Sequence, residues 1–286
     1  MKHKFNELDW INLLKNKVPK SRDVLAGIGD DCALVEAPRK NALLKSDLFI
    51  EGVHFKRKDL KLSTIVSRAV SRVLSDFAAC GGSPKFIGIS LGAPGYLKPK
   101  HLREILKEVV FLGRKYNFSL IGGDTARAPK LFFDVWGMGF ADKFISRSNA
   151  REGDFIFLTG KLGARKFDEK FTPRLKESQY LVSNFKINSM IDVSDGFALD
   201  LCRLLKESRK GALIHKAVVP VTRGESDFYR GEDYELIFTV DKNERKIDLL
   251  KSKFYFLGTI KSRKFGYKIE DKNKLSNLNI TGYTHF

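Results

Sequence analysis

One long amphipathic segment constrains the fold of this chain more than any other feature. Residues 63–79, STIVSRAVSRVLSDFAA, place apolar side chains on one face at helical spacing: Ile65, Val66, Ala69, Val70, Val73, Leu74 and Phe77. Segments 43–49 and 86–91, before and after it, have the composition of β-strands. A helix with so continuous an apolar face is buried against other elements. The pattern therefore predicts a core-packed helix in a mixed α/β fold.

The rest of the chain continues this mixture of helices and strands and divides into two domains. Near residue 150 the polar stretch SRSNAREGD interrupts the pattern, and the strand-like FIFLTG follows it. We therefore expect an N-terminal domain over 1–148 and a C-terminal α/β domain over 149–286. In the N-terminal domain we further expect a helix at 99–116, a strand that enters a Gly-Gly turn at 118–129 and a strand at 130–140. In the C-terminal domain we expect strands at 211–221, 233–240 and 254–260. Residues 190–205 are expected to form a strand, a turn and a helix that buries Phe197, Leu201 and Leu204.

The charge of the chain suits phosphorylated ligands. Its 52 lysines and arginines exceed its 34 acids, which gives a formal net charge of +18. Such a charge attracts nucleic acids, nucleotides and other phosphorylated molecules. Because the basic residues are spread along the whole chain, a solvated surface explains most of them, and we expect no dedicated nucleic-acid site.

The sequence indicates a soluble, cytoplasmic protein with no membrane partner. The longest apolar runs hold only a few residues, far short of the roughly 20 that cross a bilayer. The N-terminus has no apolar export signal. Cys32, Cys80 and Cys202 lie far apart without a C-x-x-C pair, which fits a reducing compartment and argues against a disulfide framework or a zinc knuckle. The five histidines form no H-E-x-x-H, so a zinc hydrolase is not expected.

Acidic residues recur at expected strand ends or in glycine-containing turns. The motifs G-I-G-D-D, G-G-D-T, S-D-G and G-E-D each pair a flexible backbone with a carboxylate. A single acid of this kind is ordinarily a turn former or a helix cap. The repetition favours Mg²⁺, which prefers hard oxygen ligands together with phosphate oxygens. The residues concerned are Asp30, Asp31, Asp47, Asp124, Asp192, Asp195, Glu232 and Asp233.

Asp76 is an acid in a different setting. It lies at the edge of the apolar face of the 63–79 helix, where a carboxylate needs a partner. Arg72, one turn earlier, and a metal ion are equally good candidates on the evidence of the helix alone.

Nucleotide binding would need an uncommon motif set, because G-x-x-x-x-G-K-[ST], G-x-G-x-x-G and the protein-kinase H-R-D set are all absent. Eight blocks come in the order and approximate spacing of thiamine-monophosphate kinases: GIGDDCAL, SDLFIEGVHF, LSDFAACGGSP, LIGGDTAR, SRSNAREGD, MIDVSDG, GEDYEL and GYTHF. The chain resembles this family over almost its full length. GVHF and GEDYEL point to the kinase within a superfamily that also contains aminoimidazole ribonucleotide synthetase and selenophosphate synthetase.

The resemblance implies an N-terminal metal- and ATP-binding domain that forms a dimeric barrel with a partner chain, and a C-terminal α/β domain that closes the active site. It implies ATP as co-substrate and several Mg²⁺ ions. The implied metal ligands are Asp31, Ser46, Asp47, Asp76, Asp124, Asp192 and Asp195. The implied ATP contacts are Gly123, Asp124, Arg147 and Ser194. The implied contacts to thiamine phosphate are His54, Glu232 and Tyr283.

The implied reaction transfers the γ-phosphoryl group of ATP in line to thiamine monophosphate. We expect no catalytic side chain, because the acceptor phosphate oxygen is largely ionised at neutral pH. Two alternatives are another ATP-dependent enzyme of the superfamily, acting on an aminoimidazole precursor, and a non-catalytic nucleic-acid-binding protein. The chain departs from the family at Lys45, at Arg230 and in residues 160–190, where the family has a longer helical insert.

Overall fold

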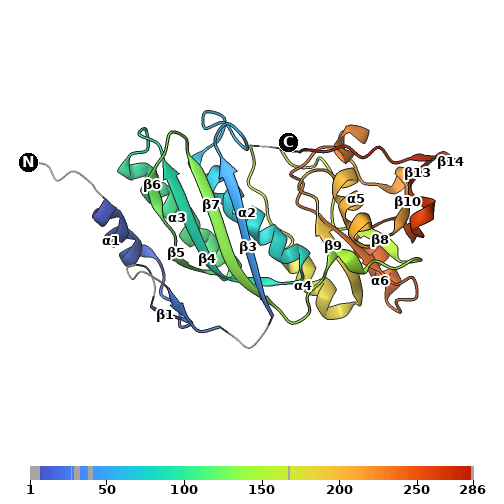
Figure 1. Cartoon of the computed structure of the whole chain (residues 1–286), viewed down its shortest axis with the longest axis horizontal. Coiled ribbons are helices and arrows are strands. Elements are labelled where there is room, and N and C mark those ends of the chain that lie inside the picture. The colour runs from blue at the N-terminus through green and yellow to red at the C-terminus, as the bar shows by residue number, and fades with distance from the viewer. Residues whose placement is uncertain (1–6, 27, 29–32, 38–40, 167, 285–286) are drawn as a thin grey trace, which may run out of the picture. The chain divides into compact units, whose positions relative to one another are not determined.

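The computed structural model describes residues 7–26, 28, 33–37, 41–166 and 168–284. The chain divides into two compact units (Figure 1). Unit 1 comprises Met1–Leu74 and Ser83–Asp142, and unit 2 comprises Ser75–Gly82 and Lys143–Phe286. Each unit contains its own sheet with helices packed on it, so the mixed α/β class is confirmed.

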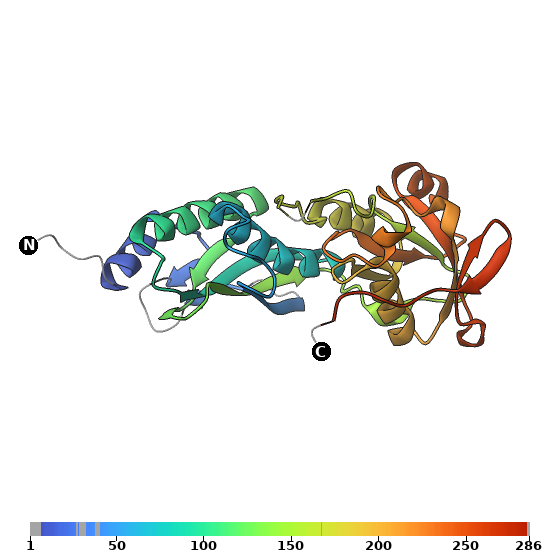
Figure 2. The ribbon, with the colours of Figure 1, turned by 90° about the horizontal axis from the view of Figure 1, so that it is seen from above.

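Unit 1 is built on a five-stranded sheet that helices cover on one face (Figure 2). Its strands are β3 (Asn41–Ile50), β7 (Phe132–Ala141), β4 (Ser83–Ala93) and β5 (Ser119–Gly122) in that order, with β6 (Thr125–Arg127) also paired to β4. The helices are α2 (Leu62–Ala79) and α3 (Pro99–Tyr116). A short α1 (Glu7–Lys17) and the pair β1 (Val24–Ala26) and β2 (Leu34–Val35) precede them.

The two faces of the unit 1 sheet differ because side chains alternate along a strand. Phe49 and Phe133 are buried on the helix-covered face. On the other face Leu44, Leu48 and Trp136 are exposed, Leu44 to 75%. Two glycines of β4 leave room for large rings on this outer face. A Cβ at Gly88 would lie 2.1 Å from the ring of Trp136, and a Cβ at Gly92 would lie 2.1 Å from the ring of Phe132.

Unit 2 is a seven-stranded sheet with helices on both faces. The strand order is β14 (Lys274–Asn277), β13 (Tyr267–Asp271), β10 (Gly211–His215), β12 (Tyr255–Lys261), β8 (Phe155–Leu158), β11 (Leu236–Val240) and β9 (Ile187–Asp192). The helix α5 (Phe197–Glu207) buries its apolar side against Ile156 and Leu158. The helices α4 (Leu175–Asn184) and α6 (Ile247–Lys253) pack with Phe157 on the opposite face.

Most expected elements are present, and two differ for identifiable reasons. The helix at 99–116 has the expected bounds, and Phe197, Leu201 and Leu204 are buried as expected. The strand expected at 211–221 ends at His215, where Lys216–Val218 form a 3₁₀ turn, and Pro220 beyond the turn could not have donated to a strand ladder. The strand expected at 233–240 begins at Leu236, because the backbone before it adopts left-handed conformations.

Among the described residues, no helix combines the length and apolarity needed to span a bilayer. The cytoplasmic location stays a prediction.

Candidate active site

In unit 1, β3 presents the predicted metal ligands Ser46 and Asp47 on opposite faces of the sheet. Asp47 lies on the helix-covered face, half-buried, and accepts a hydrogen bond from Nε of Arg72 at 3.2 Å. Arg72 also lies over the ring of Phe49, at 5.6 Å from its centroid. The hydroxyl of Ser46 donates to Oδ1 of Asp134 at 2.6 Å on the outer face. Because successive side chains alternate, Ser46 and Asp47 do not point to one place.

The Gly-Gly turn after β5 is shaped by close backbone packing. Gly123 has φ +146°, and a Cβ there would lie 1.9 Å from the carbonyl oxygen of Ile89. Only glycine fits this approach. It presents Asp124 at the surface, where Oδ1 accepts from the backbone N–H of Thr125 at 2.7 Å and the carbonyl accepts from Leu91 at 2.8 Å.

The turn after β3 fixes the orientation of His54. Nδ1 of the imidazole accepts a hydrogen bond from the backbone N–H of Ile50 at 3.0 Å, and the ring stacks on Phe49. A neutral His54 therefore carries its proton on Nε2. The carboxylate of Glu51 holds the same turn by accepting from the backbone N–H of Leu131 and from the hydroxyl of Tyr96. Burial and the Glu51 carboxylate raise the pKa of Tyr96.

In unit 2, a buried hydrogen bond links the C-terminal part of α2 to the end of β9. The hydroxyl of Ser75 donates to Oδ2 of Asp192 at 2.7 Å, and Asp192 is buried. Asp76, the next residue of α2, is half-buried. Arg72, which the helix pattern offers as a partner for Asp76, donates to Asp47.

The turn that carries Ser194 and Asp195 is held by a residue that the sequence analysis missed. Oδ2 of Asp200 accepts hydrogen bonds from the backbone N–H groups of Ser194, Asp195 and Gly196 at 3.0, 2.9 and 3.2 Å. Nη1 of Arg203 bridges Asp200 and Asp195 at 2.6 and 2.5 Å. Burial raises the pKa of the Asp200 carboxyl to about 6. The backbone hydrogen bonds and the charge of Arg203 lower this pKa but do not outweigh burial. The sequence signal that could have identified Asp200 is an aspartate in the first turn of a helix, four residues after the S-D-G motif.

Two predicted substrate contacts, Glu232 and Tyr283, lie beside this turn. The backbone N–H of Glu232 donates to the carbonyl of Ser194 at 2.7 Å, and that of Tyr283 donates to the carbonyl of Asp195 at 2.9 Å. Glu232 is half-buried and Tyr283 is exposed. Unit 2 therefore brings Ser194, Asp195, Glu232 and Tyr283 together, although Glu232 and Tyr283 are far from the turn in sequence.

Arg147 lies elsewhere in unit 2. Its carbonyl accepts from the hydroxyl of Ser208 at 2.6 Å, just after the C-terminal end of α5, whereas Ser194 precedes the N-terminal end of that helix. A helix of this length spans roughly 16 Å. The exposed side chain of Arg147 therefore starts well away from the 194–196 turn.

The predicted ligands fit Mg²⁺ by chemistry, since carboxylates supply the hard oxygens that it prefers. Within the described residues, no three or more His, Cys, Asp or Glu side chains form a group that could hold a metal ion. Asp31, the ligand predicted from G-I-G-D-D, lies outside those residues, as does its neighbour Asp30. Arg72 and Arg203 occupy the carboxylates of Asp47 and Asp195, so both arginines are placed to orient these ligands.

Comparison with known proteins places this architecture in a class. Residues 29–141 match the family described as AIR synthase related protein, N-terminal domain. Thiamine-monophosphate kinase of Buchnera aphidicola subsp. Schizaphis graminum is 30% identical over 322 residues, which cover 99% of each chain. The chain belongs to the thiamine-monophosphate kinase family, as its motifs indicated. Because that alignment is longer than the 286 residues of the chain, the relative has residues that this chain lacks.

Solved structures agree with this assignment. Thiamine-monophosphate kinase from Stenotrophomonas maltophilia K279a is 26% identical, with a TM-score of 0.76 over 95% of this chain and 98% of that one. AaThiL complexed with AMPPCP and TMP is also 26% identical, with a TM-score of 0.77 over 98% of this chain and 97% of that one. Nearly the whole chain, including both units, therefore has a structural counterpart in these solved structures.

Proposed function

We propose that this protein transfers the γ-phosphoryl group of ATP to thiamine monophosphate, giving ADP and thiamine diphosphate. The observation that carries the proposal is the 30% identity to a thiamine-monophosphate kinase over 99% of both chains. The similarity to AaThiL, solved with the ATP analogue AMPPCP and with TMP, supports the same pair of substrates. The two domains proposed for this activity are 1–148 and 149–286.

The described residues proposed to hold Mg²⁺ are Ser46, Asp47, Asp76, Asp124, Asp192 and Asp195, together with Asp31 outside them. Since the side chains of Ser46 and Asp47 lie on opposite faces of β3, they are assigned to different ions. When bound, Mg²⁺ would neutralise charge on the transferring phosphoryl group. The protein's own part is to keep the carboxylates in place through Arg72, Ser75 and Arg203. No side chain is assigned as general base, because the acceptor is an ionised phosphate oxygen.

Contacts to the two substrates follow the motifs. Gly123, Asp124, Arg147 and Ser194 are proposed to contact ATP. His54, Glu232 and Tyr283 are proposed to contact thiamine monophosphate. The Nε2–H of His54 can donate a hydrogen bond, since Ile50 already uses Nδ1.

The test is a product assay. Purified protein is mixed with γ-labelled ATP, Mg²⁺ and thiamine monophosphate, and label is expected in thiamine diphosphate. Parallel reactions contain thiamine, or an aminoimidazole ribonucleotide precursor, in place of thiamine monophosphate, and neither is expected to support turnover. Label release only with the aminoimidazole precursor would reject the kinase in favour of a synthetase-like activity.

We further propose a homodimer through the outer face of the unit 1 sheet. Leu44, Leu48 and Trp136 form an exposed apolar surface there, and surfaces of this kind mark interaction sites. Leu48→Lys is expected to shift the protein from dimer to monomer in light scattering. The matched control is Phe111→Lys, which changes a similarly exposed side chain on α3 and should leave the mass unchanged.

A further inference from the structure

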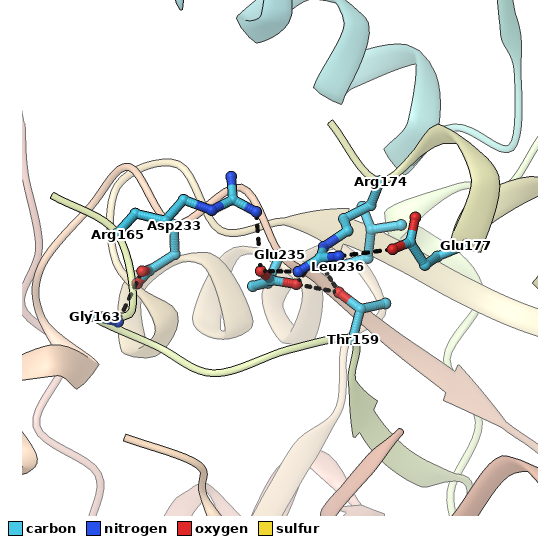
Figure 3. Close-up of polar contacts among 8 residues, drawn as sticks. All are labelled: Thr159, Gly163, Arg165, Arg174, Glu177, Asp233, Glu235 and Leu236. Carbon is cyan, nitrogen blue, oxygen red and sulfur yellow. Dashed lines mark hydrogen bonds and ion pairs between the residues drawn. The ribbon is translucent and has the colours of Figure 1, made fainter. Parts of the chain in front are cut away.

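A buried carboxylate lies directly before β11 in unit 2 (Figure 3). Glu235 is 2% exposed and accepts four hydrogen bonds. Arg174 donates two of them, from Nε at 2.7 Å and from Nη2 at 2.6 Å, and Thr159 Oγ1 and Arg165 Nη2 donate at 2.7 and 3.2 Å. A guanidinium bound through two nitrogens fixes both the distance and the orientation of its partner.

The loop that ends at Glu235 has an unusual backbone. We call residues 231–235 the GED loop. Glu232 and Tyr234 both have left-handed conformations, with φ of +72° and +51°. Residues other than glycine rarely adopt such conformations, and they keep them only where surrounding contacts hold the backbone in place. The position of Glu232 therefore depends on what holds this loop from outside.

One side of the GED loop is held by the turn after β9. The backbone N–H of Glu232 donates to the carbonyl of Ser194 at 2.7 Å, and that of Tyr234 donates to the carbonyl of Val193 at 2.8 Å. These bonds tie the loop to the turn that carries Ser194 and Asp195.

The other side is held by residues 159–174, which we call the anchor segment and which the structure describes apart from residue 167. The ring of Phe171 stacks on that of Tyr234 with centroids 3.9 Å apart and an interplanar angle of 3°. The N–H of Gly163 donates to Oδ1 of Asp233 at 2.8 Å. Gly160 leaves room for the carboxylate, because a Cβ there would lie 2.6 Å from Oε2 of Glu235.

Arg174 ends the anchor segment and is the N-cap residue of α4, so it joins the segment to the body of the unit. Burial alone would lower its pKa, but hydrogen bonds and charge from Glu235 and Glu177 outweigh burial and raise it. Its remaining terminal nitrogen, Nη1, donates to Glu177 at 2.7 Å. The contact with Glu177 lies nearer the surface than the contact with Glu235, since the Glu177 side chain is 30% exposed and that of Glu235 only 3%.

We propose that Arg174 is a positioning residue for the substrate: by clamping Glu235 it fixes the GED loop and so holds Glu232 against thiamine monophosphate. The proposal rests on the proposed function and on the contact assigned to Glu232. It gives the segment that departs from the family's longer insert a role in the site. Arg174 itself does not touch the substrate.

The first experiment measures steady-state kinetics of Arg174→Lys, which keeps the charge but loses the two-nitrogen clamp. The KM for thiamine monophosphate is expected to rise about tenfold, while the KM for ATP stays within about twofold. The matched control is Glu177→Gln, which removes the charge of the outer partner of Arg174 and should leave both KM values within about twofold of wild type. An equal rise in both KM values, or no rise in either, overturns the proposal.

The second experiment asks whether Arg174 acts through Glu232. In a Glu232→Gln background, Arg174→Lys should change the KM for thiamine monophosphate by no more than about twofold, because the group that it positions is already lost. Undiminished tenfold effects in both backgrounds would show that Arg174 acts by another route and would reject the proposal.

Hydrogen exchange tests the clamp without any activity. The amides of Glu232 and Tyr234 should exchange about tenfold faster in Arg174→Lys and at the wild-type rate in Glu177→Gln. Unchanged exchange in Arg174→Lys overturns the clamp even in an active enzyme. Wild-type protein that does not phosphorylate thiamine monophosphate would instead refute the proposed function, and the exchange data would still decide the clamp. If Arg174→Lys does not fold, Glu235→Gln, which keeps the shape of the acceptor, takes its place in all three measurements.

Discussion

The carboxylates of the two units differ in how the fold holds their oxygens. In unit 1, Asp124 is exposed and bonded to its own neighbour in the chain, and half-buried Asp47 meets one arginine. In unit 2, Asp200 accepts three backbone N–H groups and Glu235 accepts four donors, and both are buried. The acids of the two units therefore differ in how many protein donors surround them. Asp47 and Asp124 have few and are proposed as Mg²⁺ ligands, whereas Asp200 and Glu235 hold loops.

The largest effect should come from removing a loop-holding acid of unit 2. Glu235→Ala leaves Arg174 and Arg165 without their common buried acceptor, and breaking such a pair costs about 3 to 5 kcal/mol of the free energy of unfolding. Urea unfolding followed by circular dichroism measures it. A loss below about 1 kcal/mol would show that unit 2 does not depend on this acid.

Removing an acid of unit 1 that is proposed as a metal ligand should instead lower activity and leave stability unchanged. Asp124→Ala is expected to lower kcat about 10²- to 10³-fold, which is about 2.7 to 4 kcal/mol of activation free energy, because one positioned electrostatic group is lost. The free energy of unfolding should stay within about 0.5 kcal/mol, since Asp124 is exposed. Asp47→Ala should lower kcat by a similar factor. The control is Asp59→Asn, at another exposed aspartate of unit 1, which should retain wild-type kcat. Wild-type rates in Asp124→Ala would remove the main argument for the metal site.

Asp200→Asn should combine both signatures. The variant keeps an acceptor oxygen but loses the charge that three backbone N–H groups and Arg203 share, so we expect a loss of about 1.5 to 3 kcal/mol in the free energy of unfolding. Turnover should fall as well, since the 194–196 turn carries two proposed ligands. If the variant is as stable as wild type but turns over more slowly, Asp200 serves the reaction, as proposed for the acids of unit 1, and does not hold the loop.

The last effect should be a change in pH dependence, seen as a slope rather than as a loss at one pH. Burial raises the pKa of the Asp233 carboxyl from 3.8 to about 7, and the negative charges of Glu235 and Asp227 add to the rise. The hydrogen bond from Gly163 lowers this pKa but does not outweigh burial. The folded protein thus binds this proton more tightly than the unfolded chain does. The stability that the protonated form contributes is complete below about pH 4 and is lost as the pH rises to about 7.

Asp233→Asn mimics the protonated form and keeps the acceptor for Gly163. Its free energy of unfolding should fall less steeply than that of wild type between about pH 4 and pH 7, by up to about 1.4 kcal/mol per pH unit. Urea unfolding across that range compares the two proteins. Parallel curves would show that Asp233 is ionised throughout.

Local pattern was enough to predict several elements of both units. The helix at 99–116 has the expected bounds, and the helix expected at 63–79 begins one residue earlier. Such elements depend on the periodicity of neighbouring residues, which is written in the sequence itself. The helices α1, α4 and α6 were not anticipated. Their hydrophobic pattern is weaker, so packing against the rest of the unit decides them.

By itself the sequence determined the mixed α/β class and the family, because periodicity belongs to neighbouring residues and the order of motifs can be read along the chain without any knowledge of contacts. Tertiary structure alone decided which acid does which work. Arg174 reaches Glu235 across 61 residues and Ser75 reaches Asp192 across 117, and such pairings exist only once the strands are in register. Burial and the donors around each oxygen, which folding creates, identify Asp200 and Glu235 as acids that hold loops.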